Sequence, residues 1–202
     1  MKALTKSKQE QISPDTALQM LKEGNSRFVQ NKMISRNLQG QVTDTSTGQF
    51  PFAAILSCID SRVPAEIVFD QGIGDIFSAR VAGNIVNEDV LGSIEYACKV
   101  AGSKLVVVMG HTKCGAVTAA CKNVELGNIT ALLSKIKPAV EKCSKGIEMD
   151  AEAIEEVAIQ NVLLSIENIC KESPILAEME KEAQIKIVGA IYNVSSGEIS
   201  IL

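Results

Sequence analysis

The sequence predicts an α/β fold: a central, mostly parallel β-sheet flanked by helices, with an N-terminal helical arm and a C-terminal antiparallel edge strand. Short apolar runs of strand length alternate along the chain with longer stretches in which apolar residues recur at helical spacing. This alternation favours a largely parallel sheet with helical crossovers. Because no shift in composition suggests a second domain, residues 1–202 are predicted to form a single domain, with an arm (1–35) and an α/β core (36–202).

The arm is predicted to be an amphipathic helix over residues 14–32. Ser13 can serve as its N-cap, and Pro14 occupies the first helical position. The apolar residues at helical spacing are Ala17, Leu18, Leu21, Phe28 and Val29. Such a helix, detached from its own core, needs another surface to cover. The following segment, 40–51, is rich in Gly, Ser and Thr and is predicted to be a loop.

The core is predicted to contain four apolar strands followed by a short terminal one. The four strands are expected at 52–58, 75–81, 104–110 and 184–193. The long helical patterns between the third and fourth strands cover 114–124, 129–145 and 151–171. Pro138 predicts a bend or boundary in the second of these, and Asp150 is expected to cap the third. The chain then ends in a turn at Ser196 and Gly197 and a short final strand.

Charge and composition exclude several classes of partner. The net charge is −4, and Lys and Arg are scattered among acidic residues, so the chain has no basic stripe for a nucleic acid backbone. Its apolar runs fall short of the roughly 18 to 20 residues that span a bilayer, and its start has no apolar signal segment. We therefore expect a cytoplasmic protein without a membrane partner, in which the six cysteines are thiols or metal ligands.

Two segments with reactive side chains follow the first and third predicted strands. "SCIDSR" contains Cys58, and "GHTKCG" contains Cys114 and His111, the only histidine of the chain. Open parallel sheets bind ligands at the carboxyl ends of their strands, so these side chains are expected to converge if the two strands are adjacent. Two thiolates and one imidazole suit zinc, and three protein ligands leave a fourth position for water, as in catalytic sites. Zinc lowers the pKa of such a water molecule to about 7.

Asp60 and Arg62 stand two residues apart beside the predicted metal site. They are close enough for a bidentate pair that keeps Asp60 ionised and orients a carboxylate oxygen towards a zinc-bound hydroxide. Cys114 is expected near a helix N-terminus, where exposed amides favour its thiolate. Taken singly, a Cys or His is more often a packing residue, Asp60 a turn or cap residue and Arg62 a surface charge. Their combination favours metal binding.

These residues carry a resemblance that covers most of the chain. The sequence resembles the β-class carbonic anhydrases, with a plant-type-like active site, in five segments that occur in the family's order: "LQMLKEGNSRF", "SCIDSRVPAEIVFDQGIGDIFSARVAGNIV", "GSIEYA", "GHTKCGAV" and "IVGAIYNVSSGEISIL". The resemblance implies that Zn2+ is bound by Cys58, His111 and Cys114 and that the catalytic dyad is Asp60 and Arg62. The substrate-site residues that it implies, together with those expected to line the pocket, are Gln49, Phe77, Ala82, Tyr96 and Gly115.

The resemblance implies reversible hydration of carbon dioxide to bicarbonate and a proton, by a zinc-bound hydroxide that the dyad orients. Phe77, Ala82 and Tyr96 would form a small apolar pocket, and Phe77 and Tyr96 are also expected to belong to the core. Gln49 would donate its amide to a substrate oxygen, and Gly115 would offer a backbone amide near the metal.

Assembly and alternative activities also follow from the resemblance. Relatives associate through the arm and a sheet edge, with pocket residues crossing the interface, so we expect a homodimer or homotetramer without a stable monomer. Two other functions remain open. One is hydrolysis of carbonyl sulfide or carbon disulfide on the same scaffold, and the other is a zinc-binding module without turnover.

Some relatives have a second state in which the Asp of the dyad ligates zinc, and in that subtype bicarbonate is held by a Trp, an Arg and a Tyr. Here Ile55 stands at the Trp position although Arg80 matches the Arg. We therefore predict that the Asp60–Arg62 pair stays intact near neutral pH and that water stays on the zinc. Because the only histidine is a predicted ligand, none is left to shuttle protons, and turnover is expected to depend on buffer concentration.

Overall fold

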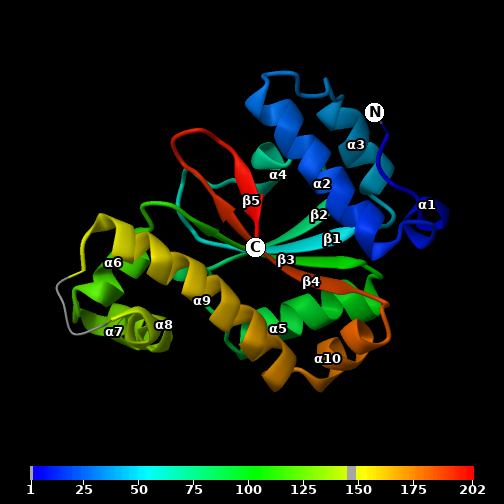
Figure 1. The fold of residues 1–202 in the computed structure, drawn as a ribbon. Helices are drawn as coiled ribbons and strands as arrows, with labels where there is room; N and C mark the ends of the chain where they lie inside the picture. Colours follow the sequence, from blue (N-terminus) through cyan, green and yellow to red (C-terminus); the bar gives the residue numbers. More distant parts are fainter. Residues whose placement is uncertain (1, 145–148) are drawn as a thin grey trace.

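The computed structural model describes residues 2–144 and 149–202 and contains the predicted sheet (Figure 1). Its strands are β1 (Ala53–Ser57), β2 (Ile76–Arg80), β3 (Leu105–His111), β4 (Lys186–Tyr192) and β5 (Ile199–Ile201). The order across the sheet is β2-β1-β3-β4-β5. The first four strands are parallel, and β5 pairs antiparallel with β4. The prediction of a mostly parallel sheet with an antiparallel edge strand is confirmed.

The helices occupy most of the segments with helical periodicity. They are α1 (Lys6–Glu10), α2 (Pro14–Val29), α3 (Leu38–Thr45), α4 (Ala65–Val68), α5 (Glu88–Glu95), α6 (Gly115–Cys121), α7 (Gly127–Ser134), α8 (Lys137–Cys143), α9 (Ala151–Glu172) and α10 (Pro174–Lys181). The predicted helix 129–145 is interrupted just before Pro138, and its last residue lies outside the described part of the chain. Asp150 caps α9 as predicted. The described helices include none that is long and apolar enough to cross a bilayer.

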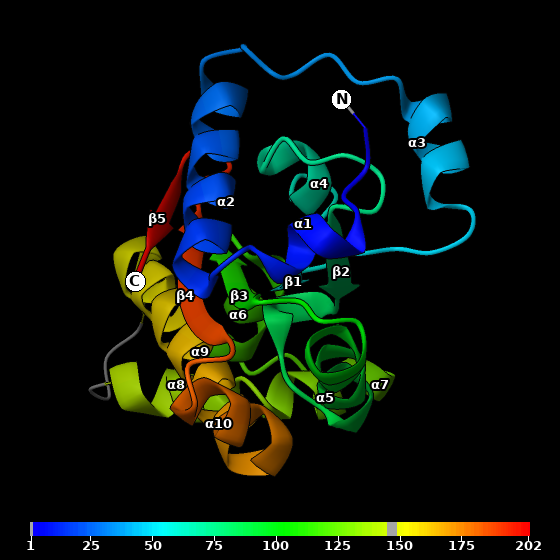
Figure 2. The same cartoon turned by 90° about the vertical axis from the view of Figure 1, so that its right-hand side faces the viewer.

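Different helices cover the two faces of the sheet (Figures 1 and 2). α2 and α4 cover one face, in a cluster that includes Leu21, Ile55, Phe69, Val107 and Met109. α5, α9 and α10 cover the other face, in a cluster that includes Leu56, Ile94, Val106, Val108 and Val162. Successive residues of β3 therefore enter opposite clusters, because adjacent side chains of a strand point to opposite faces.

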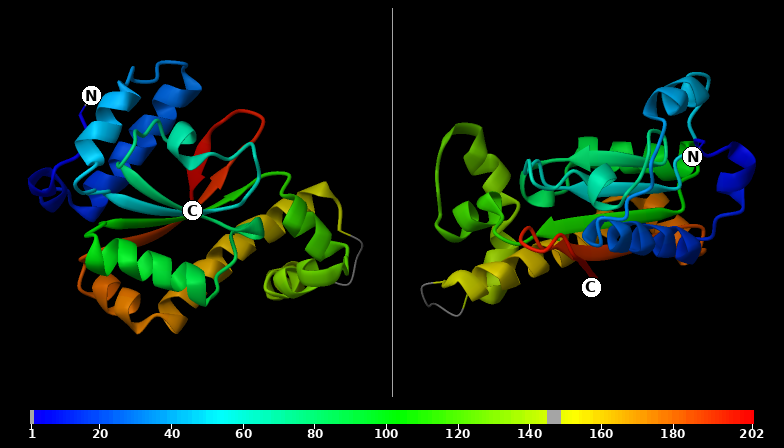
Figure 3. Two further views of the ribbon diagram at one scale, coloured as in Figure 1. Left: turned by 180° about the vertical axis from the view of Figure 1, so that it is seen from behind. Right: turned by 90° about the horizontal axis from the view of Figure 1, so that it is seen from above.

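α6, α7 and α8 lie beyond the carboxyl ends of the parallel strands (Figure 3). Together with the start of α9 they form a third apolar cluster, which includes Cys58 and Cys114. α1 lies at the opposite end of the sheet. There the side chain of Gln9 donates to the carbonyls of Pro51 at 2.7 Å and Ala101 at 2.8 Å, just before β1 and β3 begin. α6, α7 and α8 therefore cover the carboxyl ends of the parallel strands, and α1 covers the opposite end of the sheet.

The segment 40–51, predicted to be a loop, begins as part of α3. The Asn37 side chain caps this helix by accepting from the amide of Gly40 at 3.0 Å. Gln41 is buried and anchors the helix against the core. The loop prediction was therefore wrong in its first half, because a cap and a buried glutamine offset the weak helix propensity of Gly and Thr.

α2 is amphipathic, but it is not detached from its own core. Ala17 and Leu21 are fully buried against the sheet. Gly24 lies so close to Phe69 that a Cβ there would meet the Phe69 carbonyl oxygen at 1.8 Å. The side chain of Asn25 donates to two backbone carbonyls of the core. The expectation of a detached arm was wrong, because its apolar stripe fits the sheet of the same chain.

Candidate metal centre

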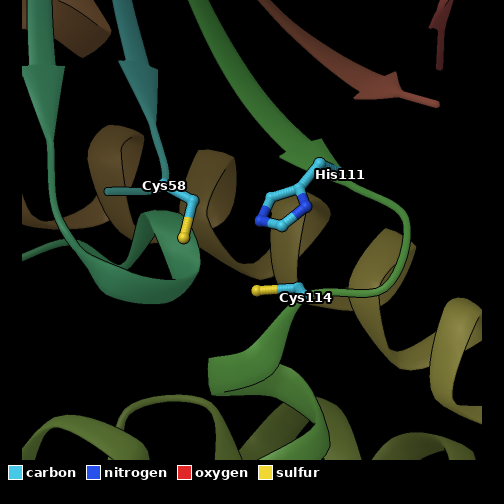
Figure 4. Close-up of side chains that lie close together, drawn as sticks. All are labelled: Cys58, His111 and Cys114. Carbon is cyan, nitrogen blue, oxygen red and sulfur yellow. The ribbon is translucent and has the colours of Figure 1, made fainter. Parts of the chain in front are cut away.

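The sheet topology brings the three predicted metal ligands together. β1 and β3 are parallel neighbours, with Ser57 opposite Met109. Cys58, directly after β1, and His111, the last residue of β3, therefore leave the same end of the sheet side by side. Cys114 follows as the N-cap of α6. The three side chains point towards one another, and their ligand atoms all lie within 4.8 Å (Figure 4).

A left-handed turn shapes the loop between His111 and Cys114. Lys113 has φ of 56°. Its amide donates to Oε1 of Glu155 on α9 at 2.8 Å, and its carbonyl accepts from Nη2 of Arg62 at 3.3 Å. The turn is thus held from both sides, and it directs the chain back so that Cys114 faces the end of β3.

The orientation of His111 leaves one ring nitrogen for a metal. Nδ1 lies 2.9 Å from the carbonyl oxygen of Thr112, and a proton on Nδ1 satisfies this contact. Nε2 is buried and has no hydrogen-bond partner among the described residues. A buried nitrogen without a partner is unfavourable, and a metal ion would use its lone pair. With two sulfur atoms beside it, this donor set fits zinc.

The environment of the two sulfur atoms favours a thiolate. The neighbouring Cys114 thiol lowers the pKa of Cys58 to about 4 against the effect of burial, and His111 and the amide of Gly83, 3.3 Å from Sγ, lower it further. The same pairing with Cys58, together with burial, raises the pKa of Cys114. Burial alone would lower the pKa of His111, but the Cys58 sulfur raises it overall. Cys58 is therefore the thiolate of this cluster, and a thiolate is the form of cysteine that binds a metal ion.

Asp60 and Arg62 form a bidentate pair at the edge of this cluster. Nε donates to Oδ1 at 2.9 Å, and Nη2 donates to Oδ2 at 2.8 Å. The hydrogen bonds from the Arg62 side chain hold the pKa of Asp60 well below its usual range. Oδ2 of Asp60 lies 4.0 Å from Nε2 of His111. An ionised carboxylate thus borders the space between the ligand atoms.

Residues near the three candidate ligands hold the backbone of the segments that carry them. Arg80 donates to the carbonyl of Cys58 at 3.1 Å and to that of Asp60 at 2.6 Å, and so braces the chain between them. Ala82 begins a short 3₁₀ turn, η1 (Ala82–Asn84). The amide of the second residue of this turn, Gly83, donates to the Cys58 sulfur. Gly115 is the first residue of α6, and a Cβ added there would meet nothing within 4 Å. Ala82 and Gly115, two of the predicted substrate residues, therefore lie beside the candidate ligands.

The other predicted substrate residues lie elsewhere on the chain. Gln49 precedes β1, whereas Cys58 follows it, so they stand at opposite ends of that strand. Phe77 and Tyr96 form an edge-to-face pair with ring centroids 6.3 Å apart, and both line a hollow of about 530 Å³. Tyr96 and Gln49 line a second hollow, of about 620 Å³. Neither hollow is lined by a candidate ligand.

The expectation that Tyr96 belongs to the core was wrong. Tyr96 is 52% exposed, and Phe77 is only partly buried. Phe77 lies in β2, the outer strand of the sheet, and Tyr96 directly follows α5.

Three contacts around the cluster were not foreseen. Gly83 donates its amide to Cys58, and its left-handed backbone, with φ of 68°, is a use of glycine that the sequence "VAGN" could have suggested. Thr112 contributes only its carbonyl, which every residue has. Glu155 lies on α9, 42 positions after its partner Lys113, and no local pattern connects them.

The fold and the cluster together define an α/β protein with a candidate Cys2His metal centre at the carboxyl ends of a parallel sheet. A family model described as carbonic anhydrase matches residues 53–199. The carbonic anhydrase of Mycolicibacterium smegmatis is 34% identical over 195 residues, which cover 94% of this chain and 93% of the relative. Carbonic anhydrase 2 of Mycobacterium tuberculosis is 35% identical over 191 residues, which cover 92% and 91%.

Solved structures agree with these sequence matches. The β-carbonic anhydrase CafA of Aspergillus fumigatus has a TM-score of 0.76 and 27% identity, over 93% of this chain and 89% of that chain. A tetrameric β-carbonic anhydrase from Sordaria macrospora has a TM-score of 0.71 and 26% identity, over 78% and 83%. The chain belongs to the β-carbonic anhydrase family. These matches confirm the prediction from the sequence that the chain is a member of the carbonic anhydrases.

Proposed function

We propose that this chain catalyses the reversible hydration of carbon dioxide to bicarbonate and a proton at a zinc site formed by Cys58, His111 and Cys114. The observation that carries the proposal is the position of the Asp60–Arg62 pair, with Oδ2 of Asp60 4.0 Å from Nε2 of His111. Membership of the family supports the choice of substrate. Zinc, when bound, supplies a Lewis acid that makes a water molecule nucleophilic near neutral pH.

The chain's own residues orient the reactants. Arg62 keeps Asp60 ionised, so that its carboxylate is a hydrogen-bond acceptor for the attacking water molecule. The guanidinium is itself held, because Nη2 also donates to the carbonyl of Lys113 at 3.3 Å. Arg80 fixes the backbone carbonyl of Asp60. These contacts present one carboxylate oxygen in one orientation, which is the arrangement that efficient positioning requires.

The substrate pocket is proposed to be shared between two copies of the chain. Ala82 and Gly115 lie beside the ligands of their own copy. Gln49, Phe77 and Tyr96 line hollows away from those ligands, so they would complete the site of a partner. Carbon dioxide is linear and apolar, and an aromatic wall with one amide donor suits it.

A homodimer or homotetramer is proposed for the same reason. Large apolar side chains are exposed around the second hollow, where Val100 is 70% and Tyr96 52% exposed. Exposed apolar surface of this kind is typical of contacts between subunits. The Sordaria macrospora relative is described as tetrameric, which supports such an assembly.

The activity can be tested by stopped-flow hydration of carbon dioxide with protein of measured zinc content, for the wild type and for Asp60→Ala. We expect fast turnover for the wild type and a loss of about a hundredfold or more in kcat for the variant, as for loss of a group that handles the proton. Zinc content should not change, because Asp60 is not a ligand. Asp44→Ala removes an exposed carboxylate of α3 and should leave turnover unchanged.

The wild type itself decides between the proposed function and its alternatives. Wild-type protein that binds one zinc per chain but does not hydrate carbon dioxide would contradict the proposed activity. Hydrolysis of carbonyl sulfide or carbon disulfide by that protein would then identify the hydrolase, and the absence of all three activities would identify a binding module.

A further inference from the structure

The carboxylate of Glu155, on α9, contacts the loop 111–114, called the metal loop below. Glu155 is neither a candidate ligand nor part of the Asp60–Arg62 dyad. We infer that Glu155 is a positioning residue of the metal centre, and that it fixes the separation of His111 and Cys114 by holding the backbone of Lys113. The inference rests on the zinc site proposed above. It adds a residue that lies outside the two segments "SCIDSR" and "GHTKCG".

The backbone of Lys113 needs support. A non-glycine residue in the left-handed region is disfavoured and persists where its surroundings hold it there. Lys113 has φ of 56°, and its amide donates to Oε1 of Glu155 at 2.8 Å. A carboxylate acceptor makes this a charge-assisted hydrogen bond, which is shorter and stronger than a neutral one. Because Lys113 stands between two ligands, its conformation sets where His111 and Cys114 lie relative to each other.

The contact of Glu155 is with the backbone and not with the lysine side chain. Nζ of Lys113 donates instead to Oγ of Ser195, at 3.3 Å, in the turn between β4 and β5. The effect of Glu155 therefore depends on the acceptor oxygen that it offers to an amide. Its role does not depend on an ion pair with Lys113.

Glu155 is held on a rigid element. The same turn of α9 contains Val157 and Ala158, which are buried in the same apolar cluster as Cys58 and Cys114. Lys113 also contacts the dyad, because the carbonyl of Lys113 accepts from Nη2 of Arg62 at 3.3 Å. A chain of contacts thus runs from α9 through the metal loop to the dyad.

The test compares two uncharged side chains of similar size in the full-length, zinc-loaded protein. Glu155→Gln keeps an oxygen that can accept from Lys113, whereas Glu155→Met does not. We expect transfer of zinc to a chelator to be about 10- to 100-fold faster in the Met variant, the range for loss of a supporting residue around a metal. The Gln variant should stay within about threefold of the wild type, as conservative rescue. Glu156→Met is the matched control, since Glu156 is exposed and its side chain makes none of the hydrogen bonds or ion pairs found among the described residues.

Two further readouts separate positioning from general stability. The hydrogen bond is open to solvent, so the melting temperature should change little in either variant. The visible spectrum of the cobalt-substituted protein should change for Glu155→Met and not for Glu155→Gln, because it reports the geometry of the ligands. In carbon dioxide hydration, kcat should fall for the Met variant with KM nearly unchanged.

The outcomes separate this inference from the proposed function. Equal zinc transfer rates for the Gln and Met variants, or rates for both that match the wild type, would overturn the role of Glu155. Those results are compatible with a wild type that binds zinc and hydrates carbon dioxide. A wild type that binds no zinc would overturn the proposed site and this inference together.

Discussion

Gly83 donates its backbone amide to Cys58, one of the three candidate metal ligands. This contact depends on the backbone conformation of Gly83. Its φ of 68° lies in the left-handed region, and its amide reaches the Cys58 sulfur at 3.3 Å. A Cβ at this position would meet Cδ1 of Ile136 at 2.6 Å. Both the conformation and the space therefore favour glycine at this position.

Gly83→Ala should weaken both the fold and the metal site. The left-handed conformation should cost about 1 to 2 kcal/mol, and displacement of the amide should lower zinc affinity about tenfold. Urea unfolding and competition with a chelator measure the two effects. Gly92→Ala is the control, because a Cβ there meets nothing within 4 Å; in α5 it should stabilise the protein by about 0.5 to 1 kcal/mol. Equal zinc affinities in both variants would contradict the role given to the Gly83 amide.

At the scale of elements, one buried carboxylate fastens the arm to the core. Asp70 is fully buried after α4, and it accepts from Nε of Arg27 in α2 at 2.6 Å. It also accepts from Nη1 of Arg36 and, at 3.2 Å, from the amide of Ile34. Burial alone would raise the pKa of Asp70, but these donors lower it overall.

Asp70→Asn should destabilise the protein by about 3 to 5 kcal/mol, because it leaves the buried guanidinium of Arg36 without its charged partner. The pH dependence has a definite sign. The folded pKa of Asp70 is lower than its unfolded value of 3.8, so its stabilising contribution is complete above about pH 4 and is lost as pH falls through the folded pKa. Urea unfolding between pH 7 and pH 3 should therefore show a steeper loss for the wild type than for the variant. Parallel curves would contradict this.

The elements themselves were predictable to different degrees. The central parallel strands β1 and β3 were predicted because burial on both faces makes them largely apolar, and every residue of both strands is buried. α3 was not predicted, because it depends on a cap and on Gln41 finding a buried position. The packing of α2 on its own sheet was not predicted either. An apolar stripe tells that a helix is covered but does not tell by which surface.

At the scale of the whole molecule, the convergence of the three candidate ligands could be predicted from the sequence, whereas the hollows lined by the proposed pocket residues could not. Cys58, His111 and Cys114 were predictable because neighbouring parallel strands end at the same edge of the sheet. The support from Glu155 was not, because it joins positions that are distant in the chain. Gln49 and Tyr96 stay predicted substrate residues, and they line a hollow that contains none of the candidate ligands.

The shared pocket predicts that two inactive variants restore each other's activity. Asp60→Ala lacks the oriented carboxylate, and the double variant Gln49→Ala, Tyr96→Ala lacks the proposed contribution to the partner's site. Both residues of the double variant are exposed, so the fold should survive. After subunits exchange, a mixed dimer holds one site with an intact dyad from one copy and an intact pocket from the other. An equal mixture should therefore recover roughly one quarter of wild-type hydration, since half of the randomly formed dimers are mixed and each has one good site. The same variants assayed apart give the baseline. No recovery in a mixture whose exchange is verified by mass spectrometry would mean that each chain holds a complete site.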